Sequence, residues 1–284
     1  MANWRDRNEP QSVSPPRLSG RCQAWPGLFT ATAAFFAYVY LPILILVALS
    51  FNENRTVTVW TGFSLDWYRM AFANRDIVGA ATNSLIIASI ASVSATTLAT
   101  LAALRMASSD RFLGKTGINA VFALPITVPE IVPAVATLMF FASLGFTFGL
   151  GTVIIGHIVF CIPFAYLPIR ARLEGMDPKI GEAAADLYAT PVRAFWRVTL
   201  PQLIPGILSG LVLAFIISLD DFVTTFFLGG AGSTTLPIYI FGLVRTGVTP
   251  EVNAISSLML LLSLSLVSLS LFLGRDQNRK SGPG

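Results

Sequence analysis

Six apolar stretches, each about long enough to cross a lipid bilayer, constrain this chain more than any other feature of its sequence. They lie at about residues 27–51, 78–104, 117–143, 152–173, 204–228 and 252–274. A spanning helix needs about 20 mostly apolar residues and satisfies its own backbone hydrogen bonds in lipid. Only 12% of the residues are charged, against about 25% in soluble domains. We therefore predict an all-α polytopic membrane protein with six transmembrane helices.

The two ends of the chain are polar. Residues 1–26 contain four arginines and several prolines, so we expect a disordered tail. The first apolar stretch exceeds the 7–15 residues of a signal-peptide core, so we expect it to remain as a span. A basic tail, residues 275–284, ends the chain.

Basic residues are distributed unequally between the segments that join these stretches. Fifteen of the nineteen lie in the N-terminal tail, the 105–116 turn, residues 170–203 and the C-terminal tail. Since Lys and Arg accumulate on the cytoplasmic side, both termini and the loop 174–203 are predicted to be cytoplasmic. The net charge of +4 thus reflects membrane topology and does not indicate a nucleic-acid partner.

Four ionisable residues fall inside the apolar stretches: Glu130, His157, Asp220 and Asp221. Glu130 lies among three prolines spaced four residues apart, and such helix breaks are tolerated at membrane depth only where protein or a water-filled cavity satisfies the backbone. Charge inside a membrane is costly and marks function by default. No Lys or Arg lies deep in any stretch, so a cationic substrate or a basic residue of a partner chain would supply the counter-charge.

We therefore predict a substrate pathway formed by Glu130, Asp220 and Asp221. Because adjacent residues point about 100° apart on a helix, only one of the two aspartates is expected to face it. The alternative is that the three acids are structural and hydrogen-bonded between helices. His157 has no carboxylate at helical spacing, which favours a packed core histidine over a proton relay.

The loop 174–203 contains two helix-start signals. Asp177 with Pro178, and Thr190 with Pro191, are typical of an N-cap followed by proline in the first turn. The sequence predicts two short helices with a break near Tyr188, the second ending near Leu200 because Pro201 follows.

This loop resembles the EAA motif of ABC-importer permeases, which is EAA, three residues, Gly, nine residues, then Ile-x-Leu-Pro. Here Glu182-Ala183-Ala184 and Val198-Thr199-Leu200-Pro201 stand at the motif's spacing, but Tyr188 replaces its glycine. A left-handed conformation costs a bulky residue about 1–2 kcal/mol, so either the break is made differently or the strain is tolerated. Ser218–Val223, Thr235–Pro237 and Gly247–Ala254 resemble the second permease subunit of spermidine/putrescine importers. Four further groups look closest to the putrescine-specific branch: Thr58–Trp60, Trp67-Tyr68, His157 and Phe160-Cys161.

The resemblance implies a type I ABC-importer permease (MetI-like) fold in the bacterial inner membrane. It also implies a second permease subunit forming a heterodimer, two ATPase subunits on the cytoplasmic face, a periplasmic substrate-binding protein and a polyamine substrate. The residues that would couple the chain to the ATPases are Glu182, Ala183, Ala184, Leu187, Tyr188, Arg193, Phe195, Leu200 and Pro201.

We expect no catalytic residues, no metal site and no cofactor in this chain. Gly114-Lys115-Thr116 resembles the end of a phosphate-binding loop, but position 109 is serine and no strand precedes it. ATP would therefore be hydrolysed by partner subunits. Two alternatives to an ABC importer remain: an ion- or proton-coupled secondary carrier that works without an ATPase, and a structural membrane anchor.

Overall fold

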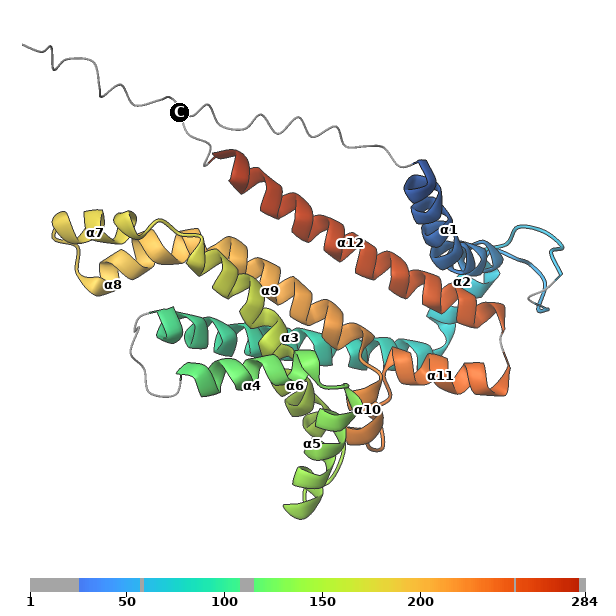
Figure 1. Ribbon diagram of the computed structural model, residues 1–284. Helices are drawn as coiled ribbons and strands as arrows, with labels where there is room; N and C mark the ends of the chain where they lie inside the picture. Colours follow the sequence, from blue (N-terminus) through green and yellow to red (C-terminus); the bar gives the residue numbers. More distant parts are fainter. Residues whose placement is uncertain (1–25, 57–58, 108–114, 248, 281–284) are drawn as a thin grey trace, which may run out of the picture. The chain divides into compact units, whose positions relative to one another are not determined.

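The structure, a computed structural model, describes residues 26–56, 59–107, 115–247 and 249–280, and this part of the chain is largely helical (Figure 1). The predicted tail at residues 1–26 falls outside it except for Pro26, as do residues 108–114 of the basic turn and the last four residues. The helical elements are α1 (Pro26–Leu49), α2 (Asp66–Ala73), α3 (Arg75–Ala107), α4 (Lys115–Thr127), α5 (Ile131–Ser143), α6 (Leu150–Glu174), α7 (Pro178–Asp186), α8 (Pro191–Ala194), η1 (Phe195–Thr199), α9 (Leu200–Asp220), α10 (Val223–Leu228), α11 (Leu236–Thr246) and α12 (Pro250–Lys280).

The chain divides into two compact units, one ending at Ile45 and one beginning at Leu46. The first unit contains most of α1, and the second contains all of the later helices. In the described residues, five helical stretches are long and apolar enough to cross a membrane: Gly27–Leu49, Arg75–Ala107, Leu150–Glu174, Pro191–Asp220 and Pro250–Ser268. They match five of the six predicted spans, while a sixfold crossing of the membrane stays a prediction.

The third predicted span is built from two helices, α4 and α5, of 13 residues each. At 1.5 Å per residue each is about 20 Å long, shorter than the roughly 30 Å hydrocarbon core of a bilayer. The helix is interrupted at residues 128–130, which include Pro129 and Glu130. The predicted disruption around the prolines is therefore present in the structure.

The prediction that the helix after Thr190 ends near Leu200 is wrong. Helical structure continues from Pro191 to Asp220, through the π-helical segment η1, in which the N–H of Leu200 bonds the carbonyl of Phe195. A proline inside a regular helix removes an N–H and clashes with the carbonyl four residues earlier. The wider π turn shifts the register, so that Pro201 falls in the first turn of α9, where proline is tolerated.

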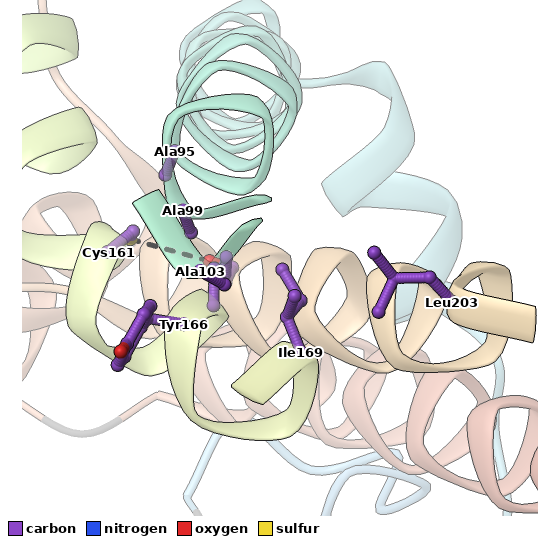
Figure 2. Close-up of a cluster of buried hydrophobic side chains, with 9 residues drawn as sticks. Ala95, Ala99, Ala103, Cys161, Tyr166, Ile169 and Leu203 are labelled. Atoms are coloured by element: carbon purple, nitrogen blue, oxygen red, sulfur yellow. Dashed lines mark hydrogen bonds between the residues drawn. The ribbon is translucent and has the colours of Figure 1, made fainter. Parts of the chain in front are cut away.

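Helices α3, α6 and α9 form the centre of the second unit and pack against one another. Alanines at four-residue spacing line one face of α3, and small side chains allow helix backbones to approach closely in a membrane. Figure 2 shows these alanines beside side chains of α6 and α9. The buried cluster consists of Ala95, Ala99, Ala103, Cys161, Ala165, Tyr166, Ile169, Leu203 and Ala214.

The contact between α6 and α9 depends on glycine at two positions. A Cβ atom on Gly210 would stand 2.7 Å from the carbonyl oxygen of Ala165, and one on Gly206 would stand 2.7 Å from the Cβ of Arg172. Backbone atoms cannot rotate away as a flexible side chain can, so any larger residue at 210 forces the two helices apart.

We expect Gly210→Ala to lower the melting temperature of the purified permease in detergent, because the new methyl group overlaps the α6 backbone. Gly79→Ala on α3 is the matched control, since a Cβ there meets nothing within 4 Å. Alanine favours a helix over glycine by about 1 kcal/mol, so this control should be neutral or stabilising. Equal melting temperatures for the two variants would contradict the close α6–α9 packing.

Candidate functional site

The two aspartates are separated by a helix end. α9 ends at Asp220, Asp221 has an extended backbone (φ −64°, ψ 120°), and α10 begins at Val223. The expectation that both lie on one continuous helix, about 100° apart, is therefore wrong. The extended residue turns the two side chains into different surroundings: Asp220 is exposed, whereas Asp221 is only 5% exposed.

His157 of α6 bridges this helix break. Its Nδ1 lies 2.8 Å from the hydroxyl of Ser218 on α9, and its Nε2 lies 2.9 Å from the hydroxyl of Thr225 on α10. A neutral imidazole can fill both positions, since one ring nitrogen donates and the other accepts. The histidine is buried, so the predicted packed, hydrogen-bonded core histidine is what the structure contains.

Asp221 lies in the same buried cluster. Its Oδ1 accepts a hydrogen bond from the backbone N–H of Thr225 at 3.2 Å and stands 3.6 Å from Nε2 of His157. Its Oδ2 is buried, with no hydrogen-bond partner among the residues that the structure describes. A buried carboxylate oxygen without a partner is costly, and such an atom calls for an explanation.

Glu130 approaches this cluster from the break between α4 and α5. Its half-exposed carboxyl group is close enough to Asp221 and His157 to interact with both electrostatically. Asp220 has no such charged neighbour in the described part of the chain. Of the three predicted pathway acids, the structure therefore brings two together and leaves Asp220 apart.

Sequence reasoning missed the two hydroxyl partners of His157. Ser218 and Thr225 are 61 and 68 residues away from it along the chain. The search for a carboxylate at helical spacing also missed Asp221, which belongs to another element. The available signal was the position of the two hydroxyls, three residues before and four residues after Asp221.

The loop 174–203 folds into two short helices at the N-terminal end of α9 (Figure 1). The side chain of Asp177 caps α7 by accepting a hydrogen bond from the N–H of Lys179 at 3.0 Å. Pro191 begins α8 as predicted, but the hydroxyl of Thr190 makes no capping bond. The loop is fastened where it meets the bundle, because Arg172 of α6 donates to the carbonyl of Gln202 on α9 at 2.8 Å.

The turn between α7 and α8 has the left-handed conformation that the motif's glycine would supply. Tyr188 has φ +56° and is the only non-glycine residue with positive φ in the described part of the chain. Its N–H bonds the carbonyl of Ala185 at 2.9 Å, and the N–H of Ala189 bonds that of Ala184 at 3.0 Å. These two bonds form a Schellman motif, in which the left-handed position is usually glycine. The strain is therefore tolerated, and the break is not made differently.

The residues predicted to couple this loop to a partner differ in exposure. Glu182, Ala183, Leu187, Tyr188, Arg193 and Pro201 are exposed, Phe195 and Leu200 are half-buried, and Ala184 is buried. Most of them thus stand on a surface that the described part of this chain does not cover, whereas Ala184 packs within the turn.

Apolar spans, a buried acidic cluster and a folded polar loop between two spans define the chain as a membrane transport protein. Residues 95–279 match the family of the binding-protein-dependent transport system inner membrane component. The chain belongs to this family, which confirms the resemblance inferred from the EAA motif.

Relatives with known roles cover most of the chain. It is 41% identical over 243 residues to the spermidine/putrescine transport system permease protein PotC of Haemophilus influenzae, covering 86% of this chain and 94% of that one. It is 38% identical over 231 residues to the putrescine transport system permease protein PotI of Escherichia coli, covering 79% and 82%.

Solved structures share the fold. A bacterial ABC transporter for the acidic polysaccharide alginate aligns with a TM-score of 0.65 at 16% identity, covering 90% of this chain and 98% of that one. The MetNI methionine ABC transporter aligns with a TM-score of 0.59 at 17% identity, covering 70% and 94%. These likenesses confirm the predicted MetI-like permease fold.

Family membership also decides between the predicted classes. It supports a permease of a binding-protein-dependent system over a secondary carrier, a passive anchor or an enzyme. In the described part of the chain, no group of three or more His, Cys, Asp and Glu residues is placed to hold a metal ion.

We expect His157→Leu to lower the thermal stability of the purified permease, because it leaves the hydroxyls of Ser218 and Thr225 without their partner. Each buried polar group left unsatisfied costs about 1–3 kcal/mol. His157→Gln should retain part of the stability, since its amide can replace Nε2 toward Thr225. Equal melting temperatures for Leu and Gln would show that the two hydrogen bonds contribute nothing.

Proposed function

We propose that this chain is a pore-forming permease subunit of an ATP-driven ABC importer that carries a polyamine, putrescine or spermidine, into the cytoplasm. The names of its 41% and 38% identical relatives support the substrate class. The observation that carries the proposal is the set of membrane-embedded carboxylates with no Lys or Arg between residues 117 and 169 or between 203 and 244.

The chemistry of a polyamine fits this arrangement. Its ammonium groups need carboxylates or other acceptors when they leave water, and its methylene groups tolerate an apolar wall. We infer that the exposed Asp220 presents its carboxylate to the pathway. Glu130 and Asp221 would form a second acidic position, at which Oδ2 of Asp221 accepts a hydrogen bond from an ammonium group.

The proposed assembly contains four kinds of subunit or partner. This chain pairs with a second permease subunit, the pair binds two ATPase subunits at the cytoplasmic face, and a periplasmic binding protein delivers the substrate. ATP is hydrolysed by the ATPases, and no cofactor is bound here. Both termini and the loop 174–203 are cytoplasmic, as the distribution of basic residues predicts.

The loop 174–203 would dock on the ATPase and transmit its motion to the spans. Leu187, Phe195 and Trp196 would provide apolar anchors, and Glu182 and Arg193 would fix the register by charge. The exposed surface of the loop supports this role. The half-buried Phe195, whose ring lies edge-on to Trp196 at 5.6 Å between centroids, would contribute less contact area than Leu187.

Asp220→Asn should raise the KM for putrescine or spermidine uptake by at least about tenfold, because a charge-assisted hydrogen bond contributes about 1.5–3 kcal/mol. Uptake of radiolabelled polyamine into proteoliposomes holding the full importer measures the effect. Asp66→Asn, an exposed aspartate on α2, is the control and should leave KM unchanged. Unaltered KM in Asp220→Asn would remove that residue from the pathway.

Glu182→Arg should abolish most polyamine uptake while the permease remains in the membrane at the wild-type level, because charge reversal on α7 opposes docking of the ATPase. Uptake and membrane content are measured in the same cells. Glu53→Arg reverses an exposed charge outside the loop and should transport normally. Wild-type uptake in Glu182→Arg would argue against the coupling role of the loop.

A further inference from the structure

Tyr188 combines a strained backbone with a side chain that gains almost nothing from burial. Its backbone is left-handed at φ +56°, which costs about 1–2 kcal/mol for a residue with a Cβ atom. Its side chain is 95% exposed, so the ring gains almost no burial in return. Glycine at this position would avoid the strain and keep both hydrogen bonds of the Schellman motif, which use only backbone atoms.

No contact within the described chain explains why tyrosine stands there. The Tyr188 hydroxyl has no hydrogen-bond partner and the ring no aromatic neighbour among the residues that the structure describes, and only its backbone is bonded, to Ala185. Backbone strain persists where something else makes use of the residue. We infer that this use lies outside the described part of the chain.

The surroundings of the ring indicate what it meets. Leu187, next to Tyr188, is 81% exposed, and Val192 and Trp196 on the helix that follows are 68% and 62% exposed. Exposed apolar side chains therefore stand on both sides of the turn, and we call them, with Tyr188, the apolar tip. The same two helical segments carry exposed side chains of both signs, Glu182 and Asp186 on α7 and Arg193 and Arg197 on α8 and η1. An apolar centre with a polar, charged rim is the composition of a protein–protein interface, and tyrosine is enriched at the centre of such interfaces.

The mixed charges favour a folded protein partner over a lipid surface. Carboxylates beside the apolar tip are repelled by the anionic lipids that attract basic segments to a cytoplasmic leaflet. A folded partner can instead pair each sign of charge and bury the ring in a pocket.

We propose that Tyr188 is a docking residue that inserts its ring into an apolar pocket of the importer's own ATPase and selects that ATPase. This rests on the proposed function, since the loop must meet an ATPase at all. The left-handed backbone aims the ring outward from the end of α7, and the Schellman hydrogen bonds hold the backbone in place before the partner arrives.

Tyr188→Gly tests the proposal because the change should keep or raise the heat stability of the permease pair while it weakens binding of the ATPase. Relief of the backbone strain should leave the isolated permease pair at least as heat-stable as the wild type. Loss of the ring should weaken binding of the purified ATPase subunit to the permease pair in nanodiscs by at least tenfold, the loss expected for an aromatic at the centre of an interface. Binding as tight as wild type would overturn the proposal.

Two further variants separate the ring from the backbone. Tyr188→Phe retains the ring and should bind within a few-fold of wild type. Tyr188→Asn tolerates the left-handed conformation without a ring and should bind as weakly as glycine. Wild-type affinity for the asparagine variant would overturn the role of the ring, whether the tip then meets lipid, a second permease pair or nothing.

Two variants together distinguish failure of the proposed function from failure of the role of Tyr188. If Glu182→Arg transports normally, the loop does not couple the ATPase, and the proposal for Tyr188 fails with it. If Glu182→Arg abolishes uptake and Tyr188→Gly binds the ATPase normally, only the role of Tyr188 is rejected. Selection is measured by comparing two ATPases, the importer's own and that of a different importer. The Tyr188→Gly permease should lose more affinity for its own ATPase than for the other one.

Discussion

A peptide group without a hydrogen-bond partner is the constraint on which the whole arrangement depends, because lipid supplies no substitute for water. In the part of the chain that the structure describes, regular α-helix is interrupted at residues 128–130, at η1 and at Asp221. At η1 the N–H of Leu200 finds the carbonyl of Phe195 one residue further back than usual. At Asp221 the side chain itself accepts a hydrogen bond from the N–H of Thr225. The irregularities at η1 and at Asp221 thus have local compensation.

The same irregularities place the acidic side chains. Glu130 stands at one helix break and Asp221 at another, and the imidazole of His157 connects the two sides of the second. On a straight helix, the direction of a carboxylate would be fixed by its position in the helical repeat. Here each break frees the backbone to bring an acid toward the same buried position, so polar chemistry and broken helices occur together.

Most of the helical framework could be predicted from the sequence, because spanning length and low charge are local properties. Five predicted spans match five helices to within a few residues, apart from the ends of α9 and α12. The end of α9 could not be predicted, because the residues Ser218–Thr225 contain no local signal that the helix ends at Asp220. The continuation past Pro201 depends on a π turn, which no proline rule anticipates. The partners of His157 come from other helices, and spacing along one helix does not reveal them.

The helical stretch from Pro191 to Asp220, which continues through the π-helical segment η1, has a geometric consequence. Its 30 residues make a rod about 45 Å long at 1.5 Å per residue. One end adjoins the turn that bears Tyr188, and the other carries the exposed aspartate. Because an angular change is multiplied by the length of the rod, a tilt of about 5° displaces one end by about 4 Å relative to the other, on the scale of a hydrogen bond. If Asp220 contacts an ammonium group as proposed, a small rotation at the loop would be enough to make or break that contact at the far end.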